Sequence, residues 1–343
     1  MKILVGMSGG LDSTYAAKKL INEGNLVEGA VLVMHEYTET EAAERAASEI
    51  GIKLHKVDCR TAFDEVVREY FVNEYINART PNPCIVCNSE VKFKFLLKYA
   101  LENGFDAIAT GHYAKVNKIS TPNGIRYAVG RARDGKKDQS YMLWRLPQEV
   151  LSRLLLPLSD LEKTEIRENA EKLGLSAAKS RDSQEICFIP DNDYASYIEK
   201  VKGETPRGSF ISEEGRVLGE HNGIIRYTVG QRKGLGISLG ERVFVTNINP
   251  VDNTVTVSPT PKMSSEVYVS DAVFSGMTEQ PCGTEMELLV KLRYQAPLAP
   301  AKVVFLGDGK LKVLLGSPFS SVTPGQSAVF YSGENLVFGG FIS

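Results

Sequence analysis

The segment best suited to chemistry is Ser8-Gly9-Gly10-Leu11-Asp12-Ser13, which follows a short apolar stretch and opens a helical one. Two adjacent glycines let the backbone turn tightly and bring its N–H groups close to an anion. The positive end of the following helix points to the same place, and Ser8, Ser13 and Thr14 add hydroxyl donors. The segment is neither a Walker loop nor a dinucleotide fingerprint. We therefore predict a pyrophosphate-binding loop, with an ordinary glycine-rich helix cap as the alternative.

Thiols are the second chemical feature. Cys84 and Cys87 lie in Thr80-Pro81-Asn82-Pro83-Cys84-Ile85-Val86-Cys87-Asn88, where two prolines predict an exposed turn rather than a helix. Cys187 follows Lys179, Arg181 and Asp182, and cations near a thiol favour its thiolate. For Cys187 alone, a buried structural cysteine is the alternative. Five cysteines with one Cys-x-x-Cys indicate catalytic or metal-binding thiols rather than a disulfide framework, and Cys59 and Cys282 have no assigned role.

The first half of the chain has the elements needed to position these groups. Apolar strands are expected at 2–6, 27–34, 54–58 and 107–110, and helices at 13–23, 39–50, 61–77 and 89–103. This alternation predicts a parallel sheet with helices on both faces. Ligands bind at the carboxyl ends of such strands, where the glycine-rich loop, Met34 and Gly111-His112 are expected to lie.

The second half is richer in short strands. A hairpin with a Pro-Asn-Gly turn is expected over 116–130, and helical segments follow near 147–173. Short β-branched strands are then expected at 242–247, 254–257, 285–294, 301–306, 310–315 and 328–331. Regular short strands with turn signals predict a small mixed domain followed by a β-barrel.

Length and composition set outer bounds on function. A chain of 343 residues that is 43% hydrophobic and 24% charged is typical of two or three globular domains. No apolar run reaches membrane-spanning length, and the first residues do not resemble a signal peptide. We therefore expect a cytoplasmic protein without a membrane partner, whose thiols are reduced.

Any contact with nucleic acid must come from local charge, because the net charge is only −2. Basic and aromatic residues gather in three places, which could supply salt-dependent phosphate contacts and base stacking. A solvated surface is the alternative for each group taken alone. The groups are Arg126, Arg131, Arg133, Lys136 and Lys137; Arg226, Arg232 and Lys233; and Lys291, Arg293 and Tyr294.

The glycine-rich segment at a strand–helix junction resembles the PP-loop of ATP pyrophosphatases, which cleave ATP between its α- and β-phosphates. Residues 109–113, 137–141, 227–236 and 293–294 resemble the tRNA-specific 2-thiouridylase (MnmA/TrmU) family. Together with the loop and the cysteines, the resemblance runs from residue 3 to about 326. It implies a PP-loop ATP-binding and catalytic domain at 1–198, a small mixed domain at 199–260 and a tRNA-contacting β-barrel at 261–343.

The resemblance implies ATP-dependent 2-thiolation of the wobble uridine, position 34, in the anticodon arm of tRNA. The 2-oxygen attacks the α-phosphorus of ATP, pyrophosphate leaves, and sulfur then displaces AMP. ATP and Mg²⁺ are the implied cofactors. The implied sulfur donor is a cysteine desulfurase relay or free sulfide.

The resemblance also implies roles for individual residues. Cys87 would be the nucleophile and Cys187 the persulfide carrier, and the two can end as a disulfide. Asp12 would hold Mg²⁺ or a positioned lysine, or instead cap the helix dipole. His112 would contact tRNA, with a core histidine as the alternative. The implied ATP-binding residues are Gly6, Met7, Ser8, Gly9, Gly10, Leu11, Asp12, Ser13, Met34 and Gly111. The implied tRNA-binding residues are Asn82, Pro83, Cys84, His112, Lys137, Asp138, Gln139, Arg293, Tyr294 and Gln326.

The chain departs from the family pattern at Cys84, where many members have aspartate. Cys84, Cys87 and Cys187 could then hold a [4Fe–4S] cluster with one open iron, or a zinc ion together with His112. Two rival functions stay open. A PP-loop amide or ester ligase acting on a small metabolite would leave the cysteines idle, and a non-enzymatic RNA- or metal-binding protein would use no ATP.

Overall fold

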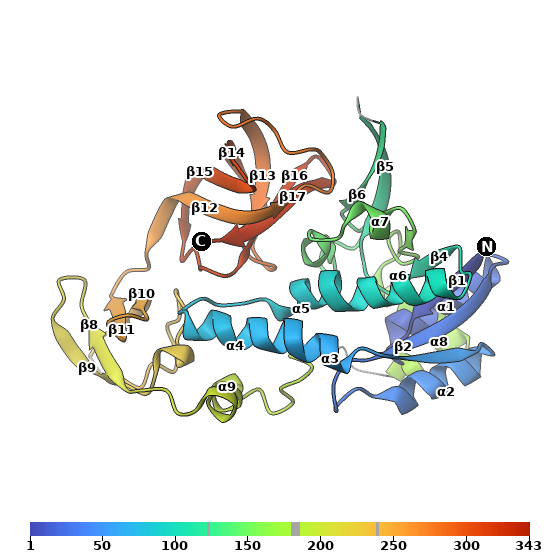
Figure 1. Ribbon diagram of the computed structural model, residues 1–343, viewed down its shortest axis with the longest axis horizontal. Helices are drawn as coiled ribbons and strands as arrows, with labels where there is room; N and C mark the ends of the chain where they lie inside the picture. The colour runs from blue at the N-terminus through green and yellow to red at the C-terminus, as the bar shows by residue number, and fades with distance from the viewer. Residues whose placement is uncertain (122–123, 180–185, 238–239) are drawn as a thin grey trace.

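The computed structural model describes residues 1–121, 124–179, 186–237 and 240–343. The strands of these residues form a five-stranded, a four-stranded and an eight-stranded sheet. In Figure 1 the part that contains the N-terminus lies at one end of the molecule, the small four-stranded sheet lies at the other, and the C-terminal strands form a separate body above them.

The first sheet is parallel, as predicted. Its order is β3-β2-β1-β4-β7, and every pairing in it is parallel. The short fifth strand was not expected from the sequence, since two leucines carry no strand signal of their own. The strands are β1 Lys2–Gly6, β2 Leu26–Val33, β3 Leu54–Asp58, β4 Ala107–Ala109 and β7 Leu154–Leu155.

Helices cover both faces of this sheet, which confirms the predicted α/β class. Along β1, Ile3 and Val5 pack with residues of α1, α2 and α8, whereas Leu4 between them packs with residues of α4 and α6 on the other face. This alternation follows from the two-residue period of a strand. The helices are α1 Leu11–Asn22, α2 Thr40–Ile50, α3 Arg60–Phe63, α4 Glu69–Ile76, α6 Phe93–Glu102, α7 Gln148–Leu151 and α8 Lys163–Lys172, with a π-helical segment, Asp64–Arg68, joining α3 to α4.

The expectation of an exposed turn at Cys84 and Cys87 is wrong. Pro83–Val86 forms a helix, α5, which runs directly into a π-helical segment, Cys87–Lys92, and then into α6. Pro83 is compatible with helix because it stands at the first position of α5, where its missing N–H is not needed. Cys84 is exposed, but Cys87 is buried.

The predicted hairpin, β5 Lys115–Thr121 and β6 Gly124–Gly130, joins the α/β part to the barrel. The turn residues Pro122 and Asn123 lie outside the described residues. Strand β6 pairs with the last strand, β17 Asn335–Ile342, at Gly130 and Asn335. A 3₁₀ segment, Ser140–Leu143, also contacts the barrel: Tyr141 Oη donates to the Ser327 carbonyl at 3.0 Å, and Trp144 Nε1 donates to Ser327 Oγ at 3.0 Å.

A small mixed sheet follows, as expected. Its order is β10-β11-β8-β9, with one parallel pairing between β8 and β11. The sequence signals located β10 and β11 but missed the two strands before them. The elements are η4 Ser176–Lys179, α9 Tyr194–Lys202, β8 Gly208–Ile211, β9 Val217–His221, η5 Ile224–Arg226, β10 Phe244–Asn249 and β11 Thr254–Ser258.

The C-terminal strands form the predicted barrel. Six strands close because β12 pairs with both β15 and β17. Their inward side chains form one apolar core. The remaining strands are β12 Met263–Val273, β13 Glu285–Lys291, β14 Ala299–Gly307, β15 Lys310–Ser320 and β16 Ser327–Ser332. In the described ranges, no helix has the length and apolar character needed to cross a membrane.

Candidate functional site

The glycine-rich loop lies between the carboxyl end of β1 and the first turn of α1. Gly9 has a φ of +79°, and a Cβ there would come within 2.4 Å of the Ala42 carbonyl carbon, so only glycine fits. Gly10 is the N-cap of α1 without a capping side chain. The first N–H groups of a helix have no intrahelical acceptor. The loop therefore offers backbone donors to an anion, as expected for phosphate binding.

The loop after β4 contacts the same helix end. A Cβ on Gly111 would lie 2.6 Å from the Asp12 carbonyl carbon, so glycine permits this close approach. Tyr113 Oη donates to Asp12 Oδ1 at 2.7 Å. From a distant part of the chain, Lys163 Nζ donates to both carboxylate oxygens of Asp12, at 2.7 and 2.8 Å. The structure thus brings Asp12 and Gly111 together and adds Lys163, which the sequence analysis did not identify.

The predicted thiol site adjoins the same edge of the sheet. Met34 directly follows β2, and its Sδ lies 3.7 Å from Cys87 Sγ. Met34 is also the residue expected to lie against the nucleotide. The contact links the phosphate-binding loop and the thiols through the ends of neighbouring strands β1 and β2. Cys87 therefore lies next to the carboxyl end of β2, the strand that pairs with β1.

Three thiols influence one another's ionisation. Burial raises the pKa of Cys87 to about 12; Lys92 opposes this rise, whereas Cys84, Cys187 and Cys59 add to it. Burial also raises the pKa of Cys84, again opposed by Lys92. By its accessible surface, however, the Cys84 residue is exposed. The thiols are therefore protonated at neutral pH in this conformation.

The expectation that cations would favour the Cys187 thiolate is wrong in this structure. Burial and then Cys84 raise the pKa of Cys187, and the opposing charges of Lys92 and Arg68 are weaker. Arg181 and Asp182, on which that expectation rested, lie outside the described residues. The neighbouring Phe188 is buried against Phe63 and Phe71, at ring-centroid distances of 5.5 and 5.4 Å. These contacts fix the chain next to Cys187.

Neither metal hypothesis is supported by this arrangement. Among the residues that the structure describes, no three His, Cys, Asp or Glu side chains come close enough together to hold a metal ion. All five cysteines are free thiols, so the Cys87–Cys187 disulfide is not formed either. The three site cysteines are neighbours, but they are not arranged as a ligand set.

His112 is influenced by Lys92, the same cation that acts on the three thiols, and is neutral at physiological pH. Burial, followed by the nearby Lys92 ammonium, lowers the pKa of His112 to about 3. Its Nδ1 lies 2.8 Å from Thr110 Oγ1, and its ring packs against Phe93. His112 thus combines features of a core histidine with a position at the site, and its contact with tRNA stays a prediction.

Several predicted tRNA-binding residues contact segments close to the thiols. Asn82 Nδ2 lies 3.6 Å from Met142 Sδ, and Gln326 Nε2 donates to the Thr80 carbonyl at 2.8 Å. Gln139 Oε1 accepts from the Tyr113 N–H at 3.0 Å. Met142 and, from the barrel, Gln326 therefore both contact the segment that leads to Cys84.

Other predicted tRNA-binding residues are engaged within the protein. Asp138 is buried and accepts from the N–H groups of Ala132 and Ser140. Arg293 donates to the Ser321 carbonyl and to Thr323 Oγ1. Tyr294 packs against Tyr141 at a ring-centroid distance of 5.9 Å. These bonds give each residue a structural role, and their contact with tRNA stays a prediction, as does that of Lys137.

Most cations of the predicted basic groups also have protein partners. Arg126 donates to the Phe274 and Ser275 carbonyls, and ion pairs engage Arg131, Arg133 and Arg226. By contrast, the exposed side chains of Lys136, Arg232 and Lys233 make no hydrogen bond or ion pair with any residue that the structure describes. These three are the cations best placed to meet a phosphate backbone.

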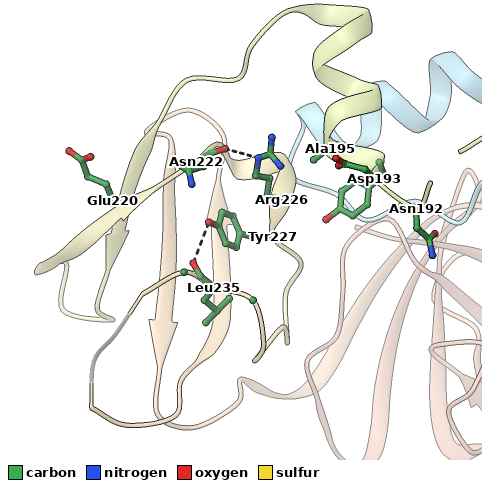
Figure 2. A pocket seen from close by; sticks show the side chains of 11 residues that line it. Asn192, Asp193, Ala195, Glu220, Asn222, Arg226, Tyr227 and Leu235 are labelled. Atoms are coloured by element: carbon green, nitrogen blue, oxygen red, sulfur yellow. Dashed lines mark hydrogen bonds between the residues drawn. The ribbon is translucent and has the colours of Figure 1, made fainter. Parts of the chain in front are cut away.

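Two cavities lie outside the predicted site. One, of about 310 Å³, lies between the start of α9 and the small mixed sheet, and Figure 2 shows Arg226, Asn222 and Tyr227 along its wall. The other, of about 490 Å³, lies between α4 and the barrel, next to Arg145 and Phe341. Neither is lined by a predicted ATP-binding residue or a site cysteine, and of the predicted basic groups only Arg226 lines the first.

Family models match almost the whole chain. They are described as a tRNA methyl transferase HUP domain at residues 1–191, a tRNA methyl transferase PRC-barrel domain at 195–259 and an aminomethyltransferase beta-barrel domain at 264–342. The succession of an α/β domain, a small module and a barrel agrees with the architecture described above.

Full-length relatives carry a more specific name. The tRNA-specific 2-thiouridylase MnmA of Clostridium acetobutylicum is 41% identical, over 99% of this chain and 99% of that protein. The proteins of the same name from Clostridioides difficile and Treponema denticola are 38% and 41% identical, over 99% and 100% of this chain and 98% of each relative.

Proposed function

This chain belongs to the tRNA-specific 2-thiouridylase family, and from that premise we propose that it is an ATP-dependent tRNA-uridine 2-sulfurtransferase. The observation that carries the proposal is the 3.7 Å contact between Cys87 Sγ and Met34 Sδ, because it joins the predicted nucleophile to a predicted ATP-binding residue. A ligase acting on a small metabolite would need the loop but not the neighbouring thiols.

Activation belongs to the glycine-rich loop in this proposal. The 2-oxygen of the wobble uridine, position 34, attacks the α-phosphorus of ATP, and the bond between the α- and β-phosphates breaks. The departing pyrophosphate binds the N–H groups at Gly9 and Gly10 and the start of α1. Asp12, in the first turn of α1, would be the carboxylate that holds a magnesium ion brought with ATP, and that ion would neutralise phosphate charge. AMP is then the leaving group at carbon 2.

Sulfur transfer belongs to Cys87 and Cys187. The terminal sulfur of a Cys187 persulfide attacks carbon 2 and expels AMP. The Cys87 thiolate then attacks the inner sulfur of Cys187, which releases the 2-thiouridine sulfur and forms a Cys87–Cys187 disulfide. An external thiol reductant restores both cysteines. Because burial raises the pKa of Cys87, this step requires tRNA binding to bring a base or cation to that thiol.

Recognition of tRNA is assigned to residues around the thiols and on the barrel. We propose that Asn82, Gln139 and Gln326 contact the anticodon arm near the target base, and that exposed cations hold its phosphates. In this proposal the α/β domain at 1–198 adenylates the uridine. The modules at 199–260 and 261–343 both bind the tRNA. For the Cys187 persulfide the sulfur donor is a cysteine desulfurase relay, whose sulfur is already at the persulfide oxidation level. Free sulfide, the alternative donor, would instead displace AMP from carbon 2 directly and leave Cys87 and Cys187 as thiols.

The test of this function uses the full chain with ATP, magnesium, a persulfide donor, a thiol reductant and unmodified tRNA. We expect 2-thiouridine, AMP and pyrophosphate in equal amounts, and loss of 2-thiouridine in Cys87→Ser. A ligase would form AMP and pyrophosphate only with a small acid or amine. A protein that only binds RNA or a metal would form neither product with any substrate.

Iron and sulfide analysis after anaerobic purification separates the persulfide route from a [4Fe–4S] cluster. Since the described residues hold no three-ligand group, we expect an iron-free protein that is active with a persulfide donor, and an active Cys84→Ala variant. Activity that depends on bound iron and is lost in Cys84→Ala would overturn the persulfide route.

A further inference from the structure

Lys163 lies where helix physics disfavours a cation. It is the first residue of α8, after a capping box formed by Glu162 and Glu165. The positive end of the helix dipole repels an ammonium group at this position. The Lys163 side chain is nevertheless only 11% exposed and points away from its own helix toward α1. A locally unfavourable residue that is buried against a functional loop indicates a role beyond helix formation.

The ammonium of Lys163 is held in one place by the phosphate-binding loop. Its Nζ lies 2.7 and 2.8 Å from the two oxygens of Asp12. Tyr113 Oη holds Asp12 Oδ1 at 2.7 Å, and the Tyr113 ring lies 5.8 Å from Lys163 Nζ. Asp12 is in the first turn of α1, so the ammonium lies beside the backbone N–H groups that the loop offers to an anion.

The Asp12–Lys163 pair is neutral, whereas ATP brings an anion and a divalent cation together. A carboxylate prefers the hard metal cation, and an ammonium prefers phosphate oxygens. Entry of both ligands therefore lets the two residues exchange partners, with every charge still paired.

Resting on the proposed ATP-dependent function, we propose that Lys163 is a phosphate-binding residue that leaves Asp12 for a β- or γ-phosphate oxygen when MgATP binds. Its ammonium then stays with the pyrophosphate until that product leaves. In a Walker loop, the positive point charge at the phosphates comes from a lysine of the loop itself. Here Lys163 supplies that charge, although it lies in a helix 151 residues farther along the chain than Asp12.

The test compares the affinities of the full-length protein for ATP and AMP by isothermal titration calorimetry with magnesium. In Lys163→Met we expect the Kd for ATP to rise about ten- to a hundredfold, as for loss of a hydrogen bond to a charged group. AMP has no β- or γ-phosphate, so its Kd should change by less than about twofold. Lys172→Met, at the exposed end of the same helix, is the matched control and should bind both nucleotides like wild type.

Equal weakening of ATP and AMP, or no change for ATP, would overturn the proposal and leave Lys163 a purely structural partner of Asp12. If Lys163→Met does not fold, Lys163→Arg and Lys163→Gln replace it. The arginine variant should then bind ATP at least about fivefold more tightly than the glutamine variant, and equal affinities would overturn the proposal. A wild-type protein that binds ATP but makes no AMP with tRNA contradicts the proposed function instead, and one that does not bind ATP contradicts both.

Discussion

At the scale of single residues, His112 makes the stability of the protein depend on pH. Its pKa is lowered to about 3 in the folded chain by burial and by Lys92, while an unfolded histidine titrates near 6.5. Below pH 6.5 the unfolded state therefore binds a proton that the folded state does not, and stability falls as the pH drops toward 3.

We expect the His112 contribution to the free energy of unfolding to fall by up to about 1.4 kcal/mol per pH unit between pH 6 and pH 4. Urea unfolding at several pH values, with wild type and His112→Gln, measures this. In His112→Gln the free energy of unfolding should change less steeply with pH. The contribution of His35 to this pH dependence should remain, because burial also lowers the pKa of His35. Parallel slopes in the two proteins would contradict the neutral, buried state of His112.

Some site residues could be predicted from the sequence because a short motif carries them. The glycine-rich loop could be recognised from the sequence, because Gly9 and Gly10 lie between a predicted strand and a predicted helix. Lys163 could not be predicted, because its significance depends on a contact with Asp12 across 151 residues. The only local signal was a lysine at the first position of a capped helix, where a cation is disfavoured.

At the scale of elements, the loop before α1 depends on one glycine that serves two purposes. Gly9 needs a positive φ of +79°, and it also needs an absent Cβ because the backbone of α2 passes 2.4 Å from where that atom would lie. Gly51, after α2, has a similar φ of +73° but nothing within 4 Å of its missing Cβ. The two positions therefore separate backbone strain from steric overlap.

We expect Gly51→Ala to lower the free energy of unfolding by about 1 kcal/mol, the cost of a left-handed alanine. Gly9→Ala should cost at least about 2 to 4 kcal/mol, because overlap with α2 adds to that strain. Urea denaturation of both variants measures the difference. Equal losses would mean that α2 moves freely away from the loop.

The helix that carries Cys84 and Cys87 shows why element boundaries could not be predicted from prolines alone. Pro81 and Pro83 signal a break, yet Pro83 begins a helix and the next turn is π-helical. A π turn adds a residue to the helical repeat and is frequent at functional sites. No local composition indicates it, because tertiary packing against Met34 and Met142 fixes this segment.

At the scale of the whole molecule, the barrel is anchored to the α/β part by buried polar contacts. Tyr141 and Trp144 both bind Ser327, and Ser140 Oγ lies 3.0 Å from Tyr331 Oη. The sequence predicted three successive modules, and their order is correct. It could not predict this docking, because residues 137–141 carried only a family resemblance and implied tRNA contacts, and nothing local indicates that Ser140 and Tyr141 bind the barrel.

The packing of the barrel against the α/β part also determines which cations are available to bind tRNA phosphates. Arg126 is engaged with the Phe274 and Ser275 carbonyls, whereas the exposed side chains of Arg232 and Lys233 make no hydrogen bond or ion pair with the described residues. Each cation that neutralises a phosphate contributes about 0.7 to 0.9 to the slope of log affinity against log salt. Replacing both Arg232 and Lys233 by glutamine should therefore reduce the magnitude of that slope by about 1.5.

Equilibrium binding of unmodified tRNA at several KCl concentrations measures this slope for wild type, the double variant and Arg126→Gln. Wild-type affinity should fall steeply with salt, and Arg126→Gln should keep the wild-type slope because its guanidinium is occupied by carbonyls. A flat wild-type response would remove electrostatic contact with tRNA from the proposed function. An unchanged slope in the double variant would show that Arg232 and Lys233 do not neutralise tRNA phosphates. The phosphate contacts would then have to come from other cations.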